Sequence, residues 1–260
     1  MRSVLPFSST ALLLCAGALF AQSPKPLTSV ATFKVAPGKV ATFVNRGKAI
    51  APALDKLMAA GTVLAYGIDV DMLHVPGENN IAFWVEAADF AGIGQVEAAI
   101  DEFAKVHPDV MGDIFSMSDP ATHHDFIVRS LESKSRKAPD GATPTVDFDI
   151  VTVKEGQMDA FMELFRKYDK PVLDKLVDDG VIFSYSVDVE AVHTMKPGTV
   201  WTIVSMPDLG GKDKVRAAFQ ESMKKTPEAE RNMVEKLSEG MVVPGSHRDS
   251  LSVSVVFKTK

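Results

Sequence analysis

Cysteine is almost absent from this sequence, which has Cys15 as its single example in 260 residues. One cysteine near the N-terminus cannot supply a disulfide framework, so the stability of the fold must come from packed cores. The same scarcity excludes an iron–sulfur cluster and a zinc site built from several cysteines. If Cys15 is removed with a leader segment, a thiol nucleophile is excluded as well.

Positive charge and long apolar runs are also scarce. The chain has 28 Lys and Arg residues against 34 Asp and Glu residues, which gives a formal net charge of −6. Nucleic acid binding needs a basic surface that releases counterions from phosphates, so we expect no nucleic acid partner. The apolar run at residues 10–20 is much shorter than the roughly 20 residues that cross a bilayer.

The N-terminal residues have the pattern of a secretory signal peptide. Arg2 supplies the positive charge, the apolar run follows, and small residues at Ala18 and Ala21 offer cleavage positions. We therefore predict a signal peptide at residues 1–21 and a mature protein that is periplasmic or secreted, with no membrane partner. The alternative is an N-terminal membrane anchor that stays uncut.

The chain contains an internal duplication. The segment PALDKLMAAG that begins at Pro52 returns as PVLDKLVDDG at Pro171, 119 positions later. Four more residues return at the same spacing, with Tyr66, Asp69, Val70 and His74 matching Tyr185, Asp188, Val189 and His193. A repeat of this length is a duplicated domain rather than a solenoid unit. The predicted division is domain 1 at 27–131, a linker at 132–144 and domain 2 at 145–260.

Each half shows the same order of predicted elements, which is strand, helix, two strands, helix and strand, with an extra helix before the last strand. Alternation of apolar residues predicts the strands, and spacing of three to four predicts the helices. Pro52 and Pro171 predict a kink or a split in the first helix of each half, because proline lacks the amide donor and clashes with the preceding turn. This order is the ferredoxin-like βαββαβ unit. The predicted fold class is α+β, with two tandem units packed sheet to sheet as an intrachain barrel.

Three features support a family resemblance: Pro37-Gly38 leading into a helix, the motif Pro-x-Leu-Asp-Lys-Leu-x-x-x-Gly, and a strand that carries a tyrosine. With them the chain resembles the dimeric α/β-barrel superfamily, and within it the antibiotic-biosynthesis-monooxygenase-like and NIPSNAP-like groups, in two fused copies. The resemblance implies cofactor-free monooxygenases, haem-degrading enzymes or haem peroxidases, with haem as a cofactor to consider. No catalytic motif of the superfamily matches residue by residue, so only the fold is carried over.

Acidic residues recur on one face of the long strand in each half. They are Asp69, Asp71, Asp188 and Glu190, with Asp147 and Asp149 on a neighbouring strand. If the strands converge, these carboxylates could gather around the pseudo-two-fold axis to bind a ligand or share protons. The alternative, which we favour, is that they are solvated at strand ends and discourage edge pairing.

Histidines and aromatic residues are the other candidates for chemistry. His74 and His193 end matching strands and could ligate haem iron or act as general bases, while the alternative is a packed histidine. His123-x-Asp125 and His247-x-Asp249 could be oriented bases or simple turn contacts. Tyr66 and Tyr185 could be catalytic, and Trp84 and Trp201 could line a pocket for a flat ligand, but core packing explains all four as well. No metal-binding spacing is present, so no metal is predicted.

Three functions are compatible with the sequence. The first is an exported module that binds a small organic ligand in a cavity between the halves. The second is a monooxygenase-like or haem-binding oxidoreductase that uses the same cavity. The third is a structural envelope protein without a small ligand.

Overall fold

The computed structural model describes residues 25–194 and 196–260, so the predicted signal peptide and Cys15 lie outside the described residues. Eight antiparallel strands form a closed barrel in the order β1-β3-β2-β8-β5-β7-β6-β4. Their bounds are β1 (Leu27–Phe33), β2 (Val63–Asp71), β3 (Ile81–Ala87), β4 (His124–Ser135), β5 (Thr145–Thr152), β6 (Ser184–Glu190), β7 (Thr199–Met206) and β8 (Arg248–Thr259). The halves meet at two seams, β2 with β8 and β4 with β6. The predicted fold class is confirmed.

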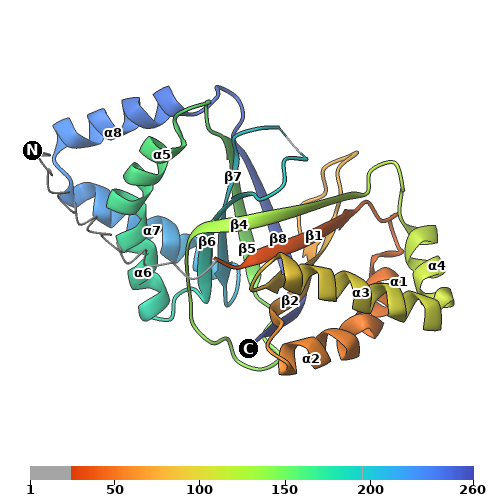
Figure 1. Ribbon diagram of the computed structural model, residues 1–260. Coiled ribbons are helices and arrows are strands. Elements are labelled where there is room, and N and C mark those ends of the chain that lie inside the picture. The colour runs from red at the N-terminus through yellow and green to blue at the C-terminus, as the bar shows by residue number, and fades with distance from the viewer. Residues whose placement is uncertain (1–24, 195) are drawn as a thin grey trace, which may run out of the picture.

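The helices cover the outside of the barrel in two groups. They are α1 (Val40–Gly47), α2 (Ala51–Ala59), α3 (Phe90–Val106) and α4 (Pro108–Met117) in the first half, and α5 (Met158–Leu164), α6 (Lys170–Asp178), α7 (Gly210–Lys225) and α8 (Glu228–Met241) in the second. The two groups lie on opposite sides of the barrel (Figure 1). Within the described residues, no helix has the length and apolar character needed to span a membrane.

The first helix of each half has an irregular turn next to its repeated proline, in keeping with the predicted kink or split. Pro52 lies in the first turn of α2 and Pro171 in the first turn of α6. A 3₁₀ turn (Lys48–Ile50) joins α1 to α2, whereas a π turn (Phe165–Asp169) joins α5 to α6. The second half has one more residue between its turn glycine and its proline. A π turn accommodates such an insertion without breaking the helix.

The two faces of the barrel wall have different neighbours. Tyr66 and Ile68 of β2 pack with the helices, so the alternate residues of that strand face the interior. Aromatic side chains contact one another in that interior. Phe126 stacks on Trp201 with ring centroids 5.7 Å apart, and Trp84 meets Phe257 edge-on at 6.0 Å.

The strand β4 is longer than predicted. It continues to Ser135, so the first four residues of the predicted linker 132–144 belong to a strand. The extension pairs with β6, where Lys134 faces Tyr185 and Ser135 faces Ser184. The segment at 132–135 is a strand because it pairs with β6 of the other half. The composition of the segment alone does not reveal that pairing.

Candidate functional site

The acidic residues of β2 and β6 lie inside the barrel. Asp69 is 5% exposed, Asp188 4% and Glu190 7%, so the favoured prediction that they are solvated at strand ends is wrong. The Ser254 hydroxyl donates to Asp69 across one seam. Across the other seam the Ser130 hydroxyl donates to Asp188 Oδ1 at 2.6 Å. Asp69 and Asp188 therefore each join the two halves through a serine.

Burial changes the acidity of this pair. Burial is the largest effect, and it raises the pKa of Asp69 and of Asp188. The serine hydrogen bonds act in the opposite direction, and the resulting pKa is about 6 for each residue. The Trp84 indole N–H also lowers the pKa of Asp69. Its Nε1 atom is buried and has no partner in normal hydrogen-bond geometry within the described part of the chain. The pair is thus set to take up protons close to neutral pH.

The other two candidate acids lie nearer the rim and have separate partners. Asp71 accepts from the Ser252 hydroxyl at 2.6 Å. Glu190 accepts from the Thr194 amide at 3.1 Å and its hydroxyl at 2.8 Å. Among the described residues, these acids do not converge into a group that could hold a metal ion. A shared metal site of these carboxylates is therefore not formed among the described residues, while their gathering to bind an organic ligand or to share protons stays a prediction.

The two repeated tyrosines have a structural partner each. The Tyr66 hydroxyl donates to Asp55 at 2.7 Å and the Tyr185 hydroxyl to Asp174 at 2.6 Å. Burial and the Asp55 carboxylate raise the pKa of Tyr66 to about 12, and burial with Asp174 raises that of Tyr185 further. Both hydroxyls stay protonated at neutral pH. These bonds explain why the aspartate of the repeated motif and the strand tyrosine return together.

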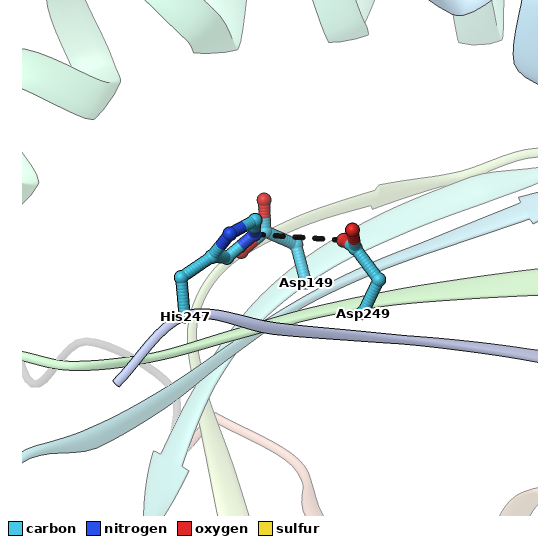
Figure 2. Close-up of side chains that lie close together, drawn as sticks. All are labelled: Asp149, His247 and Asp249. Carbon is cyan, nitrogen blue, oxygen red and sulfur yellow. Dashed lines mark ion pairs between the residues drawn. The ribbon is translucent and has the colours of Figure 1, made fainter. Parts of the chain in front are cut away.

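A third group of polar side chains lies on the outer surface of β5 and β8 (Figure 2). His247 Nε2 is 3.3 Å from Asp149 Oδ1 and 3.5 Å from Asp249 Oδ1. The three ligand atoms lie within 4.8 Å of one another, and all three residues are exposed. Asp149 therefore does not join the interior acids, and Asp147, on the same face, binds Lys212 of α7 instead.

The other histidine–aspartate pair forms in the same way. His123 Nε2 is 3.1 Å from Asp125 Oδ2. The His123 ring stacks on Phe33 with centroids 4.5 Å apart, and its Nδ1 lies 3.0 Å from the Thr32 carbonyl oxygen. This histidine is thus held by packing and by two polar contacts in the first half.

A groove of about 370 Å³ opens on the outside of the barrel, where β4 meets β6 beneath α5. We call it the seam groove. Its lining residues are Arg129, Leu131, Met158, Asp159, Met162, Arg166, Val189, Glu190, His193, Gly198 and Thr199. Of the residues predicted as site candidates, it brings together only His193 and Glu190. Tyr66, Tyr185, Trp84 and Trp201 do not line it.

The seam groove has an apolar part and a charged part. Leu131, Met158, Met162 and Val189 provide the apolar surface, and Met162 is buried. The charged side chains come from different elements. Arg166 Nε binds Glu132 Oε1 at 2.6 Å, while Asp159 lies in the first turn of α5. The arrangement suits a small molecule with an apolar body and a polar end.

The corresponding region of the first half is filled by apolar side chains. Arg129 pairs with Val189 at one seam. At the other seam Val253 pairs with Val70, so Val253 is the counterpart of Arg129 by strand register. Helix position matches Met158 and Met162 of α5 with Val40 and Val44 of α1. In the first half Val40, Val44 and Val70 pack in one cluster with Phe33, Phe43 and Phe83. The two copies of the duplicated unit therefore differ here, with a groove beneath α5 and a packed apolar cluster beneath α1.

Sequence comparison gives no relatives: no family model matches this chain, and no curated protein matches it. Its fold is similar to that of a candidate monooxygenase from Fusobacterium nucleatum subsp. nucleatum ATCC 25586, at TM-score 0.64 and 12% identity, over 92% of this chain and 96% of that chain. A candidate monooxygenase from Lactobacillus acidophilus NCFM matches at TM-score 0.62 and 14% identity, over 90% and 96%. An anthrone oxidase-like protein matches at 0.54 and 10%, over 91% and 93%. These likenesses establish the dimeric α/β-barrel fold.

Proposed function

We propose that this protein binds a small organic molecule in the seam groove. The observation that carries the proposal is the difference between the halves. At the β4–β6 seam, beneath α5, there is a groove of about 370 Å³, whereas the equivalent region beneath α1 has packed valines and phenylalanines. Ligand pockets commonly have volumes of about 300–1,000 Å³ and combine apolar walls with a few polar groups. The seam groove has both properties.

The proposed site lies at a different place from the expected ligand cavity. The expected cavity lay between the two sheets, where aromatic side chains now pack. The seam groove is also built by both halves, because Arg129 and Leu131 come from β4 of the first half. Binding at this position therefore depends on the fusion of the two copies.

Filling the groove should abolish ligand binding. Met158→Trp places a large ring at the first residue of α5, where the native side chain lines the groove. We expect the affinity for the neutral fluorescent probe N-phenylnaphthylamine to fall by about tenfold or more, since the ring occupies the volume the probe needs. The measurement is a fluorescence titration of the purified mature protein.

The matched control is Val40→Trp, the same change at the first residue of α1. It should leave probe affinity within about twofold, because Val40 packs against the apolar cluster of the first half and does not line the seam groove. Equal weakening by both variants would contradict the proposal. So would a wild-type protein that binds no apolar probe, a result that favours a structural envelope role.

A second candidate function is an oxidoreductase of the monooxygenase-like or haem-binding kind. His193 favours it, because this exposed imidazole lines the groove beside an apolar surface. Haem supplies redox chemistry at its iron, and an imidazole is a common axial ligand. His193 would be the residue to hold it, with Met158 and Leu131 against the macrocycle. The similar folds described as monooxygenases support the same class.

The histidine pair separates this candidate from simple binding. If haem is the cofactor, titration with haemin should produce a Soret band in the wild type and in His74→Ala, and a much weaker band in His193→Ala. His74 is the exposed repeat partner of His193 outside the groove, so it is the control. Identical bands from all three proteins would exclude ligation by His193.

We also propose that the protein acts outside the cytoplasm. The support is the charged and apolar pattern of residues 1–21 and a remaining chain without cysteine. The intact mass of the protein from a cell envelope fraction would show cleavage after Ala18 or Ala21. An uncut N-terminus would support the membrane-anchor alternative.

A further inference from the structure

Arg129 is the cationic side chain of the seam groove that has no side-chain partner in the part of the protein that the structure describes. It lies on β4 opposite Val189 and is exposed at the groove. Among residues 25–194 and 196–260, nothing forms an ion pair or hydrogen bond with it. A guanidinium carries five N–H donors in a planar fork and stays charged at all physiological pH values. These donors are free for a ligand.

The other charges of the groove are already compensated. Arg166 is paired with Glu132, and Glu190 accepts two hydrogen bonds from Thr194. Asp159 is the remaining anion, and it lies in the first turn of α5, where backbone N–H groups favour negative charge. The guanidinium of Arg129 is therefore the positive charge of the groove that has no anionic partner among the described residues.

The other seam of the barrel shows that this arginine is not needed by the fold. Its counterpart by strand register is Val253, at the β2–β8 seam. The same barrel wall is thus built once with a valine and once with an arginine. The arginine lies at the β4–β6 seam, which has the groove, whereas the valine lies at the β2–β8 seam, opposite Val70 of the apolar cluster.

We propose that the ligand of the seam groove is an organic acid, whose carboxylate or sulfonate-like group is held by the Arg129 guanidinium. This inference rests on the proposed binding function and adds the chemical class of the ligand. Arginine binds such groups through two parallel N–H bonds, which fixes orientation as well as charge. The hydrocarbon part of the acid lies against Met158, Met162 and Leu131.

Two probes with the same ring system test the inference. Anilinonaphthalene sulfonate carries an anionic group, and N-phenylnaphthylamine is the neutral compound without it. We expect the wild-type protein to bind the sulfonate about tenfold more tightly, the effect of one charge-assisted hydrogen-bonded pair. Arg129→Val, which copies Val253, should reduce sulfonate affinity about tenfold more than neutral-probe affinity. Arg129→Lys should retain part of the preference.

Arg216→Ala is the control, since it removes an exposed arginine on α7 away from the groove. It should leave both affinities within about twofold. Equal affinities for the two probes in the wild type, or equal loss of both in Arg129→Val, would overturn the organic-acid inference while the binding function stands. If Met158→Trp and Val40→Trp bind both probes like the wild type, the binding function itself fails, and this inference with it.

Discussion

Asp69→Asn and Asp188→Asn are each expected to stabilise the protein at about pH 8, by roughly 1–2 kcal/mol in the free energy of unfolding. The reason is that the folded state holds each carboxylate in the barrel interior with a pKa of about 6, against an ordinary value of 3.8. That difference corresponds to about 3 kcal/mol of cost for the buried charge in each residue. Loss of part of the serine hydrogen bond offsets some of the gain.

The sign of the pH dependence follows from the same values. Above about pH 6 both states are charged, and the folded state carries the full cost of burial. As the pH falls from about 7 to about 4, the folded state takes up protons first, so these two groups increase the free energy of unfolding. The advantage of each asparagine variant should therefore shrink as the pH falls and disappear near the ordinary pKa of 3.8.

Urea denaturation of each variant and of the wild type across this pH range measures the effect. Asp101→Asn, an exposed change on α3, is the control and should show no such pH-dependent difference. Asparagine variants that destabilise the protein by the same amount at every pH would show that Asp69 and Asp188 are needed as carboxylates for the serine bonds, and that their charge is not the cost we infer.

Much of the fold could be predicted because it depends on local patterns that occur twice. Alternation located the strands, the prolines located the helix breaks, and the repeated motif identified two copies of one unit. The burial of the acids could not be predicted in this way. Ser254 is 185 positions from Asp69 in the chain, and Ser130 is 58 positions from Asp188. Only closure of the barrel brings each serine to its carboxylate.

The seam groove was beyond prediction for a related reason. Its walls come from β4 of one half and α5 of the other, so no single segment contains its pattern. The residues that stand out in the sequence, such as the tyrosines and His74, are ones that the repeats share. The signal lay instead in a difference between the repeats. Arg129 stands where the duplicated strand has Val253, and that comparison needs the strand register.

Gly67→Ser should be one of the most destabilising single changes in the barrel wall, by about 2–3 kcal/mol. A Cβ atom at Gly67 would lie 2.5 Å from Trp84 Cζ2 and 2.7 Å from the Val256 carbonyl oxygen, and the second of these is backbone. The equivalent cross-strand pair of the second half is Ser186 with Ile203, where a smaller side chain faces the serine. Thermal or urea unfolding measures the loss.

The second half suggests how to test the cause. If the indole is the main obstacle, Gly67→Ser combined with Trp84→Ile should cost less than the sum of the single changes, by about 1–2 kcal/mol of coupling. Gly94→Ser on α3, where an added Cβ meets nothing within 4 Å, is the control and should change stability by less than about 0.5 kcal/mol. Strictly additive losses would mean that the Val256 carbonyl alone excludes a side chain. In that case the backbone runs differently at this position in the two halves. That difference would explain why Trp84 faces a glycine in the first half, whereas Ile203 faces a serine in the second.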